Sequence, residues 1–143
     1  MKLIVDAGPL VAQVEPGHAG RVPAKEALSR EPGLPVLSPL TAAEVDYLSQ
    51  AKAGRFGNRP FIADLAAGRF EVAALGTADF AEIERLNNRY RDLSPGIADL
   101  SVIVLAARYR TTRLLTFDQR HFRLMRPIQG GHFTLLPIDR DIE

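Results

Sequence analysis

A short apolar run at the start of the chain, followed directly by a carboxylate, constrains the fold most. Leu3–Val5 is too short for a helix and rich in β-branched side chains, which is typical of a strand buried on both faces of a parallel sheet. Asp6 follows at once, and Gly8 with Pro9 then turns the chain. Open α/β sheets place their ligands at the carboxyl ends of their strands. Asp6 is therefore a candidate site residue, although the same position also suits a cap for the following turn or helix.

Similar short runs recur along the chain and alternate with longer segments of helical periodicity. Strands are predicted over residues 3–5, 34–37, 70–75, 113–117 and 133–136, and helices or turns over 9–14, 18–30, 38–53, 57–67, 80–92 and 96–110. This alternation predicts an α/β fold, with a parallel sheet of four or five strands, helices on both faces and Leu3–Val5 at the centre. The strand over 133–136 should lie at an edge, because Pro137 ends it. No linker, repeat or low-complexity segment interrupts the pattern, so residues 1–143 are predicted to form one domain.

Three helix boundaries depend on specific residues. Ser38 and Ser94 are each followed by proline, and we expect both to open helices, since serine suits the cap position and proline the first turn. Asp79 with Glu82 has the spacing of a capping box. The helix over 96–110 is apolar almost all round and should be the most buried.

The composition excludes several classes of protein. The 143 residues contain no cysteine, which rules out disulfides and thiolate metal sites and allows a reducing, cytoplasmic location. No apolar run approaches the ~20 residues that a membrane-spanning helix needs. The N-terminus reads as a strand and lacks the pattern of a secretory signal peptide.

Positive charge is concentrated in one part of the chain. The net charge is +1, yet residues 108–126 carry six arginines against Asp118 alone. Arginine binds phosphate through a bidentate fork, so this cluster suggests an anionic partner. A compositional bias of the genome would also enrich arginine without any function. The candidates for a nucleic-acid-facing rim are Arg108, Arg110, Arg113, Arg120, Arg123 and Arg126.

Four carboxylates occupy positions that can converge at one edge of the sheet. Asp6 and Asp118 follow predicted buried strands, Glu44 lies about two turns into one helix, and Asp99 lies about one turn into another. Clustered acids repel one another unless protons or cations intervene, and Mg²⁺ and Mn²⁺ prefer carboxylate oxygens and water. The pattern therefore predicts a hard-metal site.

Each acid also has a purely structural interpretation. Thr41 and Glu44 have capping-box spacing, Asp99 suits the positive end of a helix, and Asp118 could form a local turn.

The four acids and their neighbours resemble the PIN-domain ribonucleases, and specifically the VapC-type toxins of bacterial toxin–antitoxin pairs. The matching segments are residues 3–10 (LIVDAGPL), 38–45 (SPLTAAEV), 94–100 (SPGIADL) and 115–122 (LTFDQRHF). The segments span nearly the whole chain in the family's order. One departure is Ala7, where many relatives carry a hydroxyl residue.

The resemblance implies a Mg²⁺-dependent endoribonuclease, with Mn²⁺ as an alternative cofactor, that leaves a 3′-hydroxyl and a 5′-phosphate. It implies that Asp6, Glu44, Asp99 and Asp118 are both the catalytic residues and the metal ligands. Thr116 would support them through its hydroxyl. From the arginine-rich segment, Arg120 and Arg123 are the residues that we expect to contact the RNA substrate. The implied partners are a small antitoxin protein and a second copy of the toxin in a homodimer, with no membrane involved.

Two other functions remain open at this point. An inactive PIN-like RNA-binding module would share the fold, although the intact acids argue against it. A phosphatase of the haloacid dehalogenase type also places an aspartate after its first strand, but it needs a second one where this chain has Gly8. His18, His121 and His132 are scattered, and among them His121 is the best candidate for a phosphate contact because it follows Asp118 closely.

Overall fold

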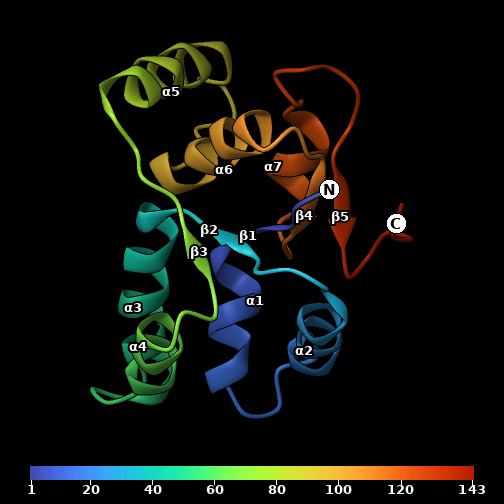
Figure 1. Ribbon diagram of the computed structural model, residues 1–143. Coiled ribbons are helices and arrows are strands. Elements are labelled where there is room, and N and C mark those ends of the chain that lie inside the picture. Colours follow the sequence, from blue (N-terminus) through green and yellow to red (C-terminus); the bar gives the residue numbers. More distant parts are fainter.

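Five short parallel strands form one sheet in the order β3-β2-β1-β4-β5 in the computed structural model of residues 1–143 (Figure 1). The strands are β1 (Ile4–Val5), β2 (Val36–Leu37), β3 (Glu71–Val72), β4 (Arg113–Leu115) and β5 (Thr134–Leu136), and every neighbouring pair is parallel. The predicted α/β fold is confirmed, with β1 at the centre and β5 at an edge.

Helices cover both faces of this sheet. They are α1 (Ala7–Val11), the 3₁₀ helix η1 (Ala12–Val14), α2 (Arg21–Arg30), α3 (Pro39–Ala53), α4 (Arg59–Ala66), α5 (Thr77–Arg89), α6 (Ile97–Arg108) and α7 (Gln119–Leu124). In Figure 1, α5, α6 and α7 lie above the sheet, and α1 to α4 lie below it. None of these helices is both long enough and apolar enough to cross a membrane.

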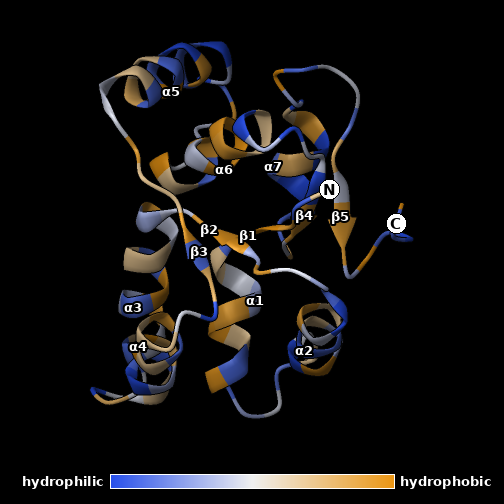
Figure 2. Ribbon diagram, viewed as in Figure 1, coloured by the Kyte–Doolittle hydropathy of each residue, from blue (hydrophilic) through white to orange (hydrophobic).

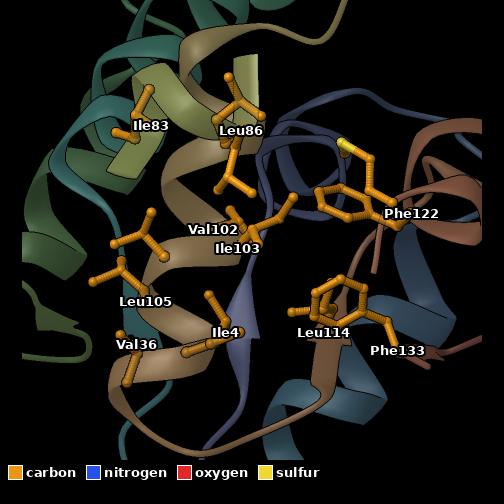
Figure 3. Packing of buried hydrophobic residues seen from close by; sticks show 14 of the residues in the cluster. Ile4, Val36, Ile83, Leu86, Val102, Ile103, Leu105, Leu114, Phe122 and Phe133 are labelled. Atoms are coloured by element: carbon orange, nitrogen blue, oxygen red, sulfur yellow. The ribbon is translucent and has the colours of Figure 1, made fainter. Parts of the chain in front are cut away.

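Successive strand residues point to opposite faces and so build two separate cores. On one side, Ile4 pairs in register with Val36 and Leu114, and all three belong to the cluster under α5 and α6 (Figure 3). The next residue of each strand, Val5 in β1 for example, belongs to the cluster on the other side. A one-residue slip would exchange the two faces, so packing on both sides fixes the register.

Helix α6 is the central helix of the upper layer. Seven consecutive residues, Leu100 to Ala106, are buried in it, and Figure 3 shows Val102, Ile103 and Leu105 among the packed side chains. Hydrophobic colours dominate this helix in Figure 2, while blue hydrophilic patches lie on α5. The expectation that this helix would be strongly buried is met, and the burial gives Asp99, in its first turn, a rigid support.

Some predicted boundaries differ from the structure. Helix α5 begins at Thr77, and the Asp79 carboxylate accepts a hydrogen bond of 2.8 Å from the Gly76 N–H. Asp79 is therefore the third residue of the helix, so the predicted capping box with Glu82 is wrong. Ser94 does not cap α6 either, since the cap residue is Gly96. Helix α7 was not predicted, because its six residues are too few to show a helical period.

Candidate metal centre

Asp6 lies at the carboxyl end of the central strand, where the sheet meets α1. The residue is buried, with 6% of its surface exposed, and its side chain makes no cap hydrogen bond to α1. Its Oδ2 atom instead accepts a hydrogen bond of 2.7 Å from the Thr116 hydroxyl, which follows β4. The interpretation of Asp6 as a simple helix cap is therefore not supported.

Asp118 lies on the neighbouring strand end and caps α7. Its Oδ1 atom accepts a hydrogen bond of 3.0 Å from the His121 N–H, and its Oδ2 atom lies 2.7 Å from His121 Nδ1. The Asp118 N–H donates to the Thr116 hydroxyl oxygen at 2.9 Å. Thr116 thus links the two strand-end acids, because its one hydroxyl group donates to Asp6 and accepts from Asp118.

Two helix starts bring the remaining acids to this edge. Asp99 Oδ2 lies 3.9 Å from His121 Nδ1, and ligand atoms of Asp99, Asp118 and His121 all lie within 4.8 Å of one another. Glu44 lies in the second turn of α3 and is exposed to solvent, but it is close enough to Asp6 for the Asp6 charge to contribute to raising the Glu44 pKa.

The start of α3 is held in place by a buried serine pair. The Ser38 hydroxyl accepts from the Leu40 N–H at 3.2 Å and lies 2.7 Å from the Ser101 hydroxyl of α6. Ser38 is therefore the cap of α3, as predicted, and Thr41 is buried inside the helix. Capping does not explain Glu44, because the Thr41–Glu44 pair is not at the helix start.

The carboxylates oppose one another's ionisation. Burial, followed by the charges of Asp6, Asp118 and Glu44, raises the pKa of Asp99 to about 7. Burial also raises the pKa of Asp6, and partial desolvation together with the Asp6 charge raises that of Glu44. The hydrogen bond to Asp118 raises the pKa of His121. A divalent cation bound among these carboxylates would offset their repulsion at neutral pH. Because the donors are oxygens, they suit a hard ion.

Comparison with known proteins identifies the fold family. The model of the PIN domain family matches residues 3–126. The chain belongs to the PIN-domain family. It is 36% identical to ribonuclease VapC26 of Mycobacterium tuberculosis (strain ATCC 25618 / H37Rv) over 135 residues, which are 94% of this chain and 100% of that protein. The resemblance to VapC-type PIN domains is therefore confirmed.

A solved structure supports the same fold. The crystal structure of Mycobacterium tuberculosis VapC20, described as a sarcin-ricin loop cleaving toxin, matches this PIN domain with a TM-score of 0.76. The match covers 83% of this chain and 92% of that one, at 14% sequence identity. At this identity the likeness concerns the fold alone.

The arginines of the PIN domain have diverse environments. Arg120 is exposed in the first turn of α7, two residues after Asp118, and has no acidic partner. Arg123 is bound by Asp139, with Nη1 2.8 Å from Oδ2, so RNA would have to compete with that ion pair. Arg110 also lacks an acidic partner, whereas Arg108 pairs with Asp79 at 2.9 Å and Arg126 contacts His132.

Arg113 is not a rim residue, so the prediction that it is a candidate to face RNA is wrong. It is 3% exposed, and its guanidinium group binds Glu31 and Asp141. Arg113 is the first residue of β4, whereas Asp118 follows the end of that strand. The Arg113 side chain therefore lies at the end of the sheet opposite to the acids.

One of the three histidines lies at the candidate site and two lie elsewhere. His18 stacks on Phe117 with ring centroids 5.4 Å apart, and His132 lies against Arg126. His121 alone lies within the acid cluster. The sequence favours the acids over His121 as site residues, yet the position of His121 three residues after Asp118 is a local signal, because that spacing brings its side chain back to the cap residue of a helix.

Proposed function

We propose that this VapC-type PIN domain is a divalent-metal-dependent endoribonuclease and the toxin of a toxin–antitoxin pair. The observation that carries the proposal is the meeting of Asp6, Asp99 and Asp118 at one sheet edge, where burial, together with the charges of the neighbouring acids, raises the pKa of Asp99 to about 7. The family supports RNA as the substrate class, since the relative VapC26 is named a ribonuclease and VapC20 a toxin.

Asp6, Glu44, Asp99 and Asp118 would hold the ion, with Mg²⁺ as the proposed cofactor and Mn²⁺ as the alternative. When bound, the ion would lower the pKa of a water molecule and offset charge that develops on the phosphoryl group. Asp6 is the least mobile of the four, because it is buried and fixed by Thr116. Asp99 and Asp118 approach from two helix starts, so the chain offers oxygen donors from different directions.

Arg120 and, more weakly, Arg123 are proposed to contact the RNA backbone. Arg120 is adjacent to the acid cluster through α7, and its guanidinium group has no protein carboxylate to compete with phosphate. Phosphate contacts of this kind position the substrate without reading its sequence.

The proposed partners follow from the family rather than from a surface of this chain. VapC-type toxins imply a cognate antitoxin, and we propose in addition a homodimer and a cytoplasmic location. Purification of the chain together with the product of a neighbouring small gene would test the antitoxin proposal. The mass of the isolated chain in solution would test the homodimer.

The test of the nuclease proposal is cleavage of RNA by purified protein with Mg²⁺ and with chelator. Asp99→Asn keeps the side-chain shape and should reduce cleavage to the level of chelated wild type. Asp92→Asn is the matched control, because Asp92 is exposed and lies outside the cluster, and it should cleave like wild type. Tight RNA binding without Mg²⁺-dependent cleavage would instead support the inactive RNA-binding module, and full activity of Asp99→Asn would contradict the proposed site.

A further inference from the structure

We propose that His121 is a positioning residue, which holds the Asp118 carboxylate in its metal-binding orientation by tethering it to the backbone of the segment before α6. This inference rests on the proposed function, because it takes Asp118 to be a metal ligand.

His121 contacts both oxygens of the Asp118 carboxylate. Its backbone N–H donates to Oδ1 at 3.0 Å, and Nδ1 lies 2.7 Å from Oδ2. The backbone contact is an ordinary helix cap, but the ring contact is not needed for capping. The ring therefore restrains the rotation of a carboxylate whose first oxygen is already held.

The other ring nitrogen is anchored to main chain. Nε2 of His121 lies 3.3 Å from the carbonyl oxygen of Leu93. Carbonyl and carboxylate oxygens only accept hydrogen bonds, so a neutral ring donates to one of the two, and only the imidazolium, with both nitrogens protonated, donates to both at once. The imidazole thus bridges Asp118, the cap of α7, to a backbone group that lies 28 residues before His121 in the chain.

The Leu93 carbonyl is a firm anchor. The Leu93 side chain packs against the upper core, and its N–H donates to the Tyr90 carbonyl at 2.9 Å. Ser94 follows with φ of 49°, a left-handed conformation that is uncommon for serine and that persists only where surrounding contacts enforce it. This strained segment leads directly to α6 and Asp99, so His121 connects the supports of two acids.

Asp118 needs such a restraint more than the other strand-end acid does. Asp6 is buried, whereas the Asp118 side chain is 31% exposed. The negative charges of Asp6 and Asp99 would drive a free Asp118 carboxylate outward into solvent, because like charges repel. The His121 ring lies within the cluster, with Nδ1 3.9 Å from Asp99 Oδ2, so its contact with Asp118 Oδ2 holds the carboxylate inward and opposes that rotation. Loss of such supporting hydrogen bonds typically weakens metal binding about 10- to 100-fold.

Two amide substitutions separate the two ring contacts. The side-chain nitrogen of asparagine can occupy the place of Nδ1, and that of glutamine the place of Nε2. His121→Asn therefore keeps a donor toward Asp118, whereas His121→Gln keeps a donor toward Leu93. Titration calorimetry with Mn²⁺ on metal-free protein measures the result, and His132→Gln is the matched control for an exposed histidine outside the cluster.

Positioning through the tether predicts that His121→Gln, which loses the donor toward Asp118, weakens Mn²⁺ binding about 10- to 100-fold. His121→Asn keeps that donor but loses the anchor at Leu93, so it should weaken binding measurably but less than His121→Gln, and His132→Gln should be unchanged. If the Leu93 contact only stabilised the fold, His121→Asn, which loses it, should melt at a lower temperature than His121→Gln. The two His121 variants should then bind Mn²⁺ with equal affinity. Equal affinities of the two variants, tighter binding by His121→Gln, or wild-type affinity of His121→Asn would overturn the inference while leaving the metal centre intact. If the wild type itself bound no Mn²⁺, the proposed metal centre would fall, and the positioning role with it.

Discussion

Replacing Arg113 by methionine should destabilise the PIN domain strongly without any direct effect on the acid cluster. All five guanidinium N–H groups have acceptors: Nε and Nη2 bind Asp141 at 3.0 and 2.9 Å, Nη1 and Nη2 bind Glu31 at 3.2 and 2.9 Å, and Nη1 binds the Met1 carbonyl at 2.8 Å. The cluster joins the end of α2, the first residue and the C-terminal tail, and Figure 1 shows both termini beside β5.

The size of the effect follows from which partner is left buried. The Glu31 side chain is 6% exposed, so without Arg113 its charge loses its counterion in a desolvated place, whereas Asp141 is 38% exposed and can turn to water. Removing one partner of a buried ion pair costs about 3–5 kcal/mol. Unfolding of 143 residues carries an entropy of about 0.3 kcal/mol per kelvin, so the melting temperature should fall by about 10–17 °C.

Thermal melts by circular dichroism in the absence of metal measure this shift. Arg120→Met is the matched control, because the same substitution at an exposed site without a carboxylate partner should leave the melting temperature unchanged. A double variant, Arg113→Met with Glu31→Leu, should recover part of the loss, since it removes the stranded charge. A shift below about 3 °C for Arg113→Met, which corresponds to about 1 kcal/mol, would refute the argument that this ion cluster stabilises the fold.

Two further predictions concern the site. The pKa of Asp99 is raised from its ordinary value of 3.8 to about 7. Between these two pH values the folded protein therefore holds a proton that the unfolded chain has released. Without metal, the free energy of unfolding should for this reason fall as pH rises from about 4 to 7. Asp99→Asn should therefore raise the melting temperature at pH 8 but not at pH 4, and a rise of equal size at both values would contradict the repulsion argument. Arg120→Ala should weaken the binding of all RNA sequences equally and reduce the slope of log affinity against log salt concentration by about one unit, without changing thermal stability. Arg123→Ala should in addition leave Asp139 without its ion pair. Unchanged affinity and slope in both variants would place the RNA path elsewhere.

The architecture could be read from local patterns because each pattern reflects a local cause. Leu3–Val5 must be buried on both faces, which places β1 in the middle of a parallel sheet, and Pro137 must end the last strand. Ser38 caps α3 as its residue type indicates. By contrast, the capping box at Asp79 and the start of α6 at Ser94 were misplaced, since in both cases a glycine supplies the cap and residue type alone does not identify it.

The candidate site could be predicted only in part from local sequence patterns. The four acids stand out because two follow strands and two lie in the first two turns of helices, and the order of their motifs matches a family. The raised pKa of Asp99 arises from burial and from repulsion among the acids, and both depend on distances that only the folded chain defines. The link from His121 to Asp118 is local and its spacing is visible in the sequence, but the anchor at Leu93 is not.

The sequence by itself therefore determined which elements form and which acids lie at their ends, because propensity, capping and apolar periodicity act over a few residues. Only the tertiary structure decided the roles of individual charged side chains. Arg113 belongs by sequence to the same basic cluster as Arg120, yet it binds partners 82 and 28 residues away and is buried, while Arg120 remains free. The difference arises from packing: burial forces a charged group to find counterions wherever the chain brings them, and that choice is made by long-range contacts.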